Sequence, residues 1–175
     1  MVCLMALFAA STKAQNGNST EKNWFNSKLM VELEASSGLK QHGIQPIIGA
    51  TNIGWRILPQ LSVYARWQGM KGLYDLNGNR TYFNAQNLGG GLEYTFARES
   101  FGNGSVLFGA RAQMTAGIGS PEWKNTTYDL GLTMHLQPKC GKTNIYFGLG
   151  FRHINSHTTG LRDLNGIYGT IGFGI

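Results

Sequence analysis

Hydrophobic and polar residues alternate along most of the chain, and the alternation is strictest in its last nine residues, 167–175. Ile167, Ile171, Phe173 and Ile175 share one side of this segment, and small or polar residues occupy the other. Successive side chains of a β-strand point to opposite faces, so the pattern predicts a strand with one apolar face. An edge strand has to be paired or protected, and pairing the last strand with the first would close a barrel. A closed barrel can span a membrane.

Seven earlier segments alternate in the same way, so the fold is expected to be all-β: an eight-stranded antiparallel up-and-down transmembrane barrel. These segments are approximately residues 28–35, 47–57, 61–70, 84–96, 105–118, 127–136 and 145–152. Compact turns are expected at 58–60, 98–104 and 138–142, and longer polar loops at 36–42, 71–81, 119–125 and 155–163. Short turns at one rim and long loops at the other are typical of outer-membrane barrels.

The first 27 residues do not alternate and form two other segments. Residues 1–15 are apolar, then small and polar, with Ala14 before Gln15, and this order predicts a secretory signal cleaved after Ala14. The signal lacks a basic start, so we expect its beginning to be truncated; a buried N-terminal helix is the alternative. Residues 16–27 are predicted to be a polar periplasmic leader and residues 28–175 the barrel domain. No run approaches about 18 consecutive apolar residues, so no transmembrane helix is expected.

Alternation alone does not say which face of the barrel is inside. A soluble lipocalin-like barrel would have an apolar lumen and a polar exterior. The membrane arrangement is favoured because aromatic residues lie near strand ends and because the polar face carries many charges. In the membrane arrangement the polar face lines the lumen, and its expected charged and histidine residues are Glu32, Glu34, Arg56, Arg66, Glu93, Arg111, Asp129, His135 and Arg152. Buried charges need partners, so an Arg111–Asp129–Arg152 cluster is predicted, the alternative being separately hydrated charges.

Composition narrows the function further. The chain has 175 residues, 25 of them glycine, and a net charge of +6, but its basic residues are scattered. Nucleic-acid binding requires clustered Lys and Arg, so it is not expected. Removal of the signal would leave Cys140 as the single cysteine, which excludes an internal disulfide and a cysteine-based zinc site. The segment 75–79 begins like a calcium loop but lacks the required glycine and distal glutamate, so no metal and no cofactor are expected.

The segment 152–157, Arg-His-Ile-Asn-Ser-His, leads into the last strand. In this position it resembles the His-x-Ser-Asn motif of the lipid A 3-O-deacylases, which are eight-stranded outer-membrane barrels. His153 matches the family histidine, but Asn155 replaces the serine and Ser156 follows one residue late, on the other face of the strand. Tyr168 occupies the position of the catalytic carboxylate, with Asp163 nearby. The resemblance implies a candidate catalytic set of His153, Ser156 and Asp163.

Over most of its length after the signal, the chain resembles small outer-membrane barrels of the OmpX-like or OmpA-barrel type. The resemblance implies a monomer in the outer membrane of a Gram-negative bacterium, inserted by the outer-membrane assembly machinery. Its expected partners are outer-membrane lipid and lipopolysaccharide, whose phosphates would meet the exposed residues Lys71, Arg80, Trp123 and Lys124. The expected function is a non-enzymatic barrel for envelope integrity or surface binding. The alternatives are a divergent lipid A-modifying hydrolase and a soluble lipocalin-like binder.

Overall fold

The computed structural model describes residues 29–76, 79–102, 104–138 and 143–175, and these residues form eight strands. The predicted signal, the leader and Cys140 lie outside this part of the chain. The strands are β1 (Leu29–Gly38), β2 (Ile44–Leu58), β3 (Leu61–Leu76), β4 (Asn79–Phe101), β5 (Gly104–Gly117), β6 (Asn125–Pro138), β7 (Asn144–Ser156) and β8 (Leu164–Gly174). Within the described ranges there is no helix long and apolar enough to cross a membrane.

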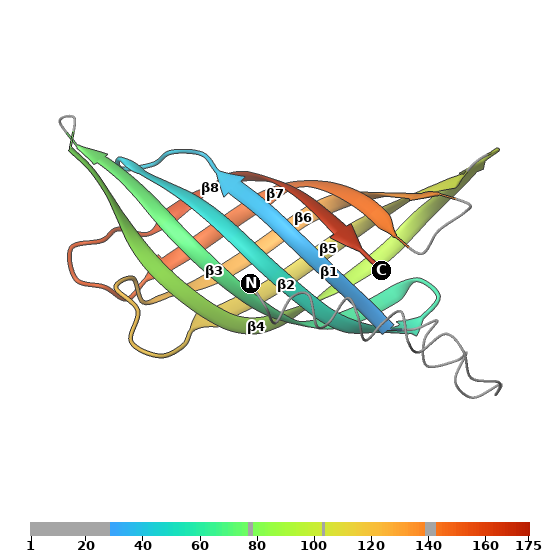
Figure 1. Ribbon diagram of the computed structural model, residues 1–175, viewed down its shortest axis with the longest axis horizontal. Coiled ribbons are helices and arrows are strands. Elements are labelled where there is room, and N and C mark those ends of the chain that lie inside the picture. The colour runs from blue at the N-terminus through green and yellow to red at the C-terminus, as the bar shows by residue number, and fades with distance from the viewer. Residues whose placement is uncertain (1–28, 77–78, 103, 139–142) are drawn as a thin grey trace.

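Each strand pairs antiparallel with its neighbours in sequence, and β8 pairs with β1 to close the barrel (Figure 1). At this seam Ala35 lies opposite Ile171, and the backbones of Val31 and Ile175 exchange hydrogen bonds of 3.2 and 3.0 Å. The closed sheet leaves no unpaired edge along these segments. The predicted eight-stranded antiparallel up-and-down barrel is therefore confirmed.

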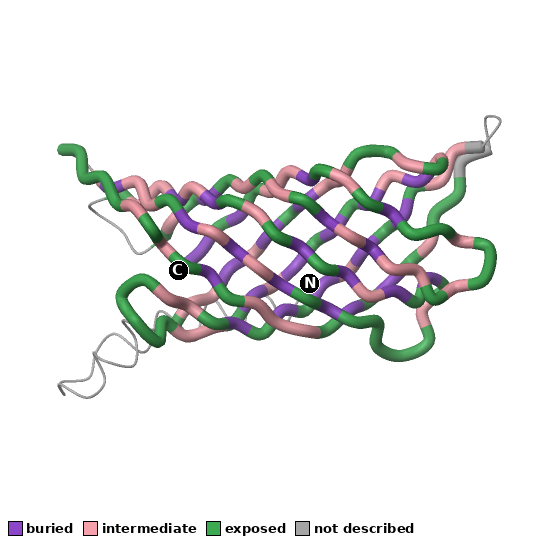
Figure 2. Tube along the Cα trace, turned by 180° about the vertical axis from the view of Figure 1, so that it is seen from behind, coloured by how far each residue is buried: buried purple, intermediate pink, exposed green. Residues whose placement is uncertain are grey.

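The two ends of the barrel differ. The connections between β1 and β2, β3 and β4, β5 and β6, and β7 and β8 gather at one end, which we call the loop end (Figure 1, left). The other three connections gather at the opposite end, the turn end. Buried and exposed residues alternate along the strands, as the sequence pattern requires (Figure 2).

Two of the predicted connections are instead strand. The polar segment 71–81 was expected to be a loop, but β3 and β4 pair through it as far as Leu76 and Asn79. Likewise, the expected turn 98–104 is a hairpin in which Phe101 lies opposite Gly104. Backbone pairing satisfies these peptide groups without an alternating apolar face, so hydrophobic periodicity does not detect such extensions.

Candidate functional site

The lumen holds two layers of side chains. Around the middle and toward the turn end lies the charged layer, which consists of Glu32, Glu34, Arg66, Glu93, Arg111, Asp129, His135 and Arg152, all buried. Toward the loop end lies the apolar layer, which consists of Ile44, Ile48, Ala50, Met70, Ala85, Trp123, Ile154 and Leu164. Strand parity predicts the charged lumen positions but not the apolar layer.

Arg111 lies at the centre of the charged layer. Its guanidinium contacts Glu32 at 3.0 Å, Glu34 at 3.3 Å and Glu93, whose carboxylate accepts a 2.6 Å hydrogen bond from Nε. The faces of Tyr64 and Tyr146 cover the guanidinium, with their ring centroids 5.3 and 4.8 Å from Cζ. One buried cation thus serves three carboxylates between two aromatic rings.

Arg66 binds the same group of carboxylates from β3. It donates two hydrogen bonds to Glu34, of 3.0 and 2.8 Å, and further bonds of 3.0 Å to Asn52 and Gln68. Asn52 in turn donates to Glu32 at 3.1 Å. Because Arg66 is fully buried, this two-point pairing provides the compensation that a desolvated charge requires.

Arg152 and Asp129 form a separate pair between β7 and β6. Nε and Nη2 of Arg152 each donate a 2.7 Å hydrogen bond to Asp129, and Nη2 also donates to Ser36 of β1 at 3.2 Å. Cζ lies 4.2 Å from the ring centroid of Tyr168. Gln113 donates to Asp129 at 2.7 Å, and accepts from Tyr64 at 2.9 Å. A polar chain therefore links this pair to the surroundings of Arg111.

The predicted Arg111–Asp129–Arg152 cluster is wrong in one member. Arg111 lies opposite Gly131 on β6, whereas Gln113 lies opposite Asp129. The amide of Gln113 thus occupies the place expected for a second guanidinium, and Arg111 turns to the glutamates of β1 and β4 instead. Which residue lies opposite Asp129 depends on the register between β5 and β6. Alternation within one strand does not determine this register.

Arg56 is also misplaced in the prediction. It lies on the lumen parity of β2 and is paired with Ser62 of β3, but this is the last pair before an irregularity between Arg56 and Leu58 at the turn end, and its side chain is exposed. The described layer therefore has four carboxylates and three guanidiniums, with His135 bound to Glu93 at 2.5 Å.

Small residues provide the space for the lumen tyrosines. A Cβ atom added to Gly172 of β8 would overlap the ring of Tyr146, and one added to Gly91 of β4 would lie 2.5 Å from the hydroxyl oxygen of Tyr64. These tyrosines share the lumen parity of Arg66 and Arg152 in the sequence, so strand parity could have identified them as lumen residues alongside the charges.

Trp123 was expected to be exposed on the surface, but it is buried. Its side chain is 0% exposed and packs in the apolar layer at the loop end. Its indole N–H donates to Ser156 Oγ at 3.2 Å, and its backbone N–H donates to the carbonyl of Asn84 at 3.0 Å. The β5–β6 loop therefore folds back and inserts its tryptophan into the barrel.

The candidate catalytic residues His153, Ser156 and Asp163 do not form a catalytic site. His153 lies on the outward parity of β7, where it stacks on Tyr128 and bonds to the side-chain amide of Asn165. Ser156 lies on the inward parity and accepts the bond from Trp123, while Asp163 accepts the backbone N–H of Ser156 at 2.8 Å. A serine nucleophile requires a base within hydrogen-bond reach. Here the histidine, the serine and the carboxylate each have another partner.

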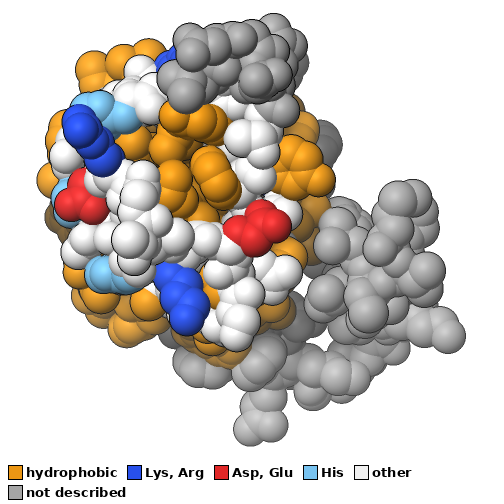
Figure 3. Space-filling model, turned by 90° about the vertical axis from the view of Figure 1, so that its left-hand side faces the viewer, with side chains coloured by type: hydrophobic (Ala, Val, Ile, Leu, Met, Phe, Trp, Pro, Cys, Tyr) orange, Lys and Arg blue, Asp and Glu red, His pale blue; other side chains and the backbone are white. Residues whose placement is uncertain are grey.

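The loop-end rim is polar around an apolar centre. Figure 3 shows the histidines of this end gathered on one side, with basic side chains among them. Lys40, His42, Lys124 and His157 are exposed there, and His157 bonds to Thr126 at 3.0 Å. Lys71 is exposed and lies over the ring of Tyr82, 5.1 Å from its centroid. Arg80 was also expected on this surface, but its side chain lies outside the described residues.

Comparison with known proteins identifies the fold. No protein-family model matches the chain, and no curated protein matches it in sequence. Among solved structures it is similar to Neisserial surface protein A, with a TM-score of 0.54 and 13% identity over 84% of this chain and 94% of that one. The outer membrane enzyme PagL aligns over 82% of this chain and 98% of its own, with 13% identity and a TM-score of 0.40, too low to indicate an activity. The chain thus shares the fold of small eight-stranded outer-membrane barrels.

Proposed function

We propose that this protein is a monomeric, non-enzymatic β-barrel of the bacterial outer membrane, which contributes to envelope integrity or binds ligands through its loop end. The fold resembles that of outer-membrane barrels. The lumen is filled by side chains, so the protein is a packed structural element with a surface for binding rather than a wide pore.

The observation that carries this proposal is the inverted distribution of polarity. Leucines on the strands of the outer wall are largely exposed: Leu149 at 69%, Leu130 at 65% and Leu132 at 62%. Glu32, Arg66 and Arg111 are buried. A soluble barrel would expose this apolar wall to water at a large cost, whereas a bilayer covers it. The soluble lipocalin-like alternative requires the opposite arrangement.

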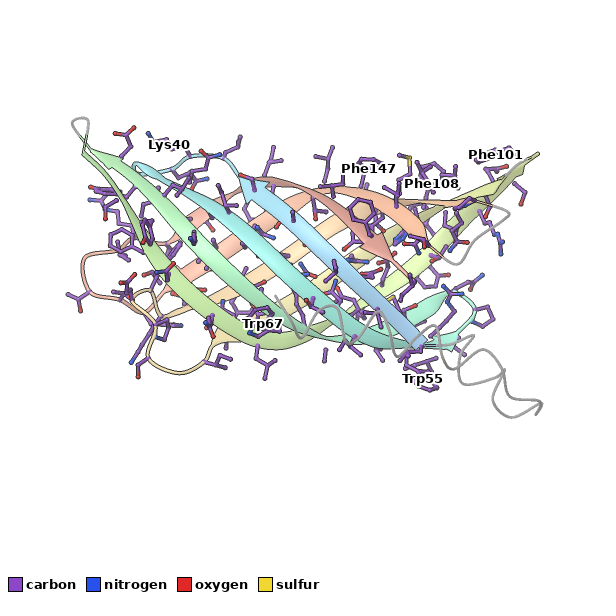
Figure 4. The ribbon with its side chains drawn as sticks, viewed as in Figure 1. Lys40, Trp55, Trp67, Phe101, Phe108 and Phe147 are labelled. Carbon is purple, nitrogen blue, oxygen red and sulfur yellow. The ribbon has the colours of Figure 1, made fainter. Side chains whose placement is uncertain are left out.

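Aromatic side chains support the same reading. Trp55, Trp67, Phe108 and Phe147 point outward from the wall (Figure 4). Outward aromatic side chains enlarge the apolar surface that a bilayer would cover. The absence of contact between His153 and Ser156 in the described geometry gives the hydrolase alternative no support.

Cell fractionation combined with a heat-modifiability gel tests the proposal. We expect the protein in the outer-membrane fraction, with different mobility in unheated and boiled samples because a folded barrel resists detergent until it is heated. A protein found in the soluble fraction, with one mobility in both samples, would rule out the membrane assignment and favour the lipocalin-like alternative.

A further inference from the structure

An apolar groove of about 780 Å³ crosses the outer wall of the barrel. It extends from Phe108 on β5 and Phe147 on β7, past Ile171 on β8, to Ser37 on β1 and Ile47 on β2. Figure 4 shows Phe108 and Phe147 along one edge of the barrel, with Lys40 on the same edge nearer to the loop end. The groove therefore slants from the middle of the wall toward the loop-end rim.

The groove includes a position where a small residue, Gly169, lies between larger side chains of the outer wall. Leu149 lies opposite Gly169, and Gly169 lies opposite Ser37. A Cβ atom added to Gly169 would meet only the Leu149 side chain, at 3.8 Å. This glycine differs from Gly172 of the lumen, where a Cβ would overlap Tyr146. Packing within the protein therefore does not require the gap at Gly169, and a molecule from outside can fill it.

The groove has the dimensions of a single lipid chain. The part of the groove from Leu132 on β6 to Ile47 on β2 crosses four inter-strand steps, roughly 19 Å at the usual strand spacing. One leaflet of a bilayer contributes roughly 15 Å of hydrocarbon thickness. A slanted acyl chain from the outer leaflet would span this distance, and the apolar lining offers it little but hydrocarbon contact.

Positive charge marks the loop-side end of the groove. Lys71 on β3 lies directly opposite the groove residue Ile47, and Lys40 follows β1 shortly after Ser37. Both lysines are exposed, and none of the ion pairs within the described residues involves them. Nearby Glu122 accepts hydrogen bonds from the backbone and side-chain amide of Asn84. Lys71 lies over the ring of Tyr82, a contact that leaves its charge without a carboxylate among these ion pairs, so both lysines can meet an anionic headgroup.

We propose that this groove holds one acyl chain of an anionic, phosphate-bearing membrane lipid, whose headgroup lies between Lys40 and Lys71. The proposal rests on the membrane location proposed above and specifies the ligand class and its site. The apolar groove selects the chain, and the two lysines select the charge of the headgroup.

Lipid retention measured by native mass spectrometry tests the groove. The full chain, folded in detergent, is titrated with dimyristoylphosphatidylglycerol or with dimyristoylphosphatidylcholine, which have the same chains and differ in net charge. We expect Ala35→Leu, at the groove, to weaken retention of both lipids by about fourfold for each methylene it displaces. Ala65→Leu is the matched control, because Ala65 also faces outward on β3 but does not line the groove.

Charge substitutions test the headgroup site separately. In wild type we expect the phosphatidylglycerol to bind more tightly than the phosphatidylcholine. The double variant Lys40→Gln/Lys71→Gln should lose this preference, by about fivefold for each charge, and should keep its affinity for the neutral lipid. The control Arg56→Gln/Arg98→Gln removes the same charge from exposed positions at the turn end and should leave the preference unchanged.

Equal retention by the Ala35→Leu and Ala65→Leu variants would overturn the groove, and equal affinity of wild type for the two lipids would overturn the headgroup site. Each variant is first checked for a heat-modifiable band, so that misfolding is recognised. If Ala35→Leu does not fold, Gly169→Val, which adds an isopropyl group over the open groove position, replaces it. Failure of the membrane proposal looks different, because wild type itself would then be soluble and show no mobility shift.

Discussion

The two layers of the lumen fill the same barrel by opposite means. In the charged layer, Arg111, Arg66 and Arg152 bind carboxylates from other strands, so each contact depends on direction and register. In the apolar layer, Trp123, Ile48 and Met70 pack without polar partners apart from the indole N–H. Packing tolerates substitution of similar volume, whereas a buried ion does not tolerate the loss of its partner. The comparison suggests that the charged layer sets the alignment of the strands and the apolar layer closes the loop end.

Removal of the central cation should have the largest effect. Arg111→Met leaves Glu32, Glu34 and Glu93 buried together without their shared cation. We therefore expect the free energy of unfolding to fall by about 5 kcal/mol, or the barrel not to fold at all. Urea unfolding of the protein in lipid vesicles, followed by its heat-modifiable band, measures the loss. Arg56→Met, an exposed arginine, should change stability by less than about 0.5 kcal/mol. Similar losses in both variants would contradict the role given to Arg111.

In the apolar layer, Trp123→Ala should lower stability by about 4 kcal/mol, because it leaves a cavity and frees Ser156. The same unfolding assay applies. Phe101→Ala is a suitable control, since Phe101 is exposed on the hairpin at the turn end and should cost far less. If Trp123→Ala unfolded like this control, the side chain would not be part of the core.

A double substitution can replace the Arg152–Asp129 ion pair of the charged layer with two apolar side chains, like those of the apolar layer. Arg152→Met alone should cost about 3 kcal/mol because Asp129 loses its two-point partner. The double variant Arg152→Met/Asp129→Leu should recover most of that stability, since two apolar side chains replace the pair. A double variant less stable than Arg152→Met alone would show that the layer needs this ion pair for more than charge balance.

Ser156→Ala should cost about 1 kcal/mol, since it removes the acceptor of the buried Trp123 indole N–H. Urea unfolding detects this shift, with Ser100→Ala as an exposed serine control. A larger loss would indicate that Ser156 does more than hold the tryptophan.

The smallest effect, no change at all, is expected for lipid A hydrolysis. Mass spectrometry of lipid A from cells that express wild type or His153→Ala should give the same profile, because His153 is bound to Asn165 on the outer face and Ser156 points inward. A 3-O-deacylated species that is present with wild type and absent with His153→Ala would establish the hydrolase instead.

Much of the architecture could be predicted from the sequence because a strand has a period of two. Alternation located the eight strands and placed Glu32, Arg66 and Arg152 on one face. It could not reveal which strands meet across the lumen. Arg111 reaches Glu32 and Glu34 from the other side of the barrel, and this contact depends on closure and on the register of every intervening pair.

The apolar layer was harder to predict for a different reason. Ile44 and Ile48 are buried inward on β2, while Ile47 and Ile53 on the same strand face outward and are exposed. With apolar residues on both faces near the loop end, the sequence pattern no longer separates inside from outside. Trp123 lies in a polar loop, and its insertion depends on the tertiary contact of that loop with Asn84.

The seam between β1 and β8 has a consequence for how the barrel is completed. Its register pairs cover Glu32–Gly38, with backbone hydrogen bonds continuing to Val31 and Leu39, whereas the β3–β4 ladder is longer and runs along all of Leu61–Leu76. The first strand is held in addition from within, because Glu34 receives hydrogen bonds from Arg66, Arg111 and Tyr146. Before β5 and β7 pack against β1, water has to take the place of Arg111 and Tyr146 as the partner of Glu34. Drying of the interior and joining of the first and last strands should therefore occur as one concerted step, and an unclosed barrel should remain hydrated inside.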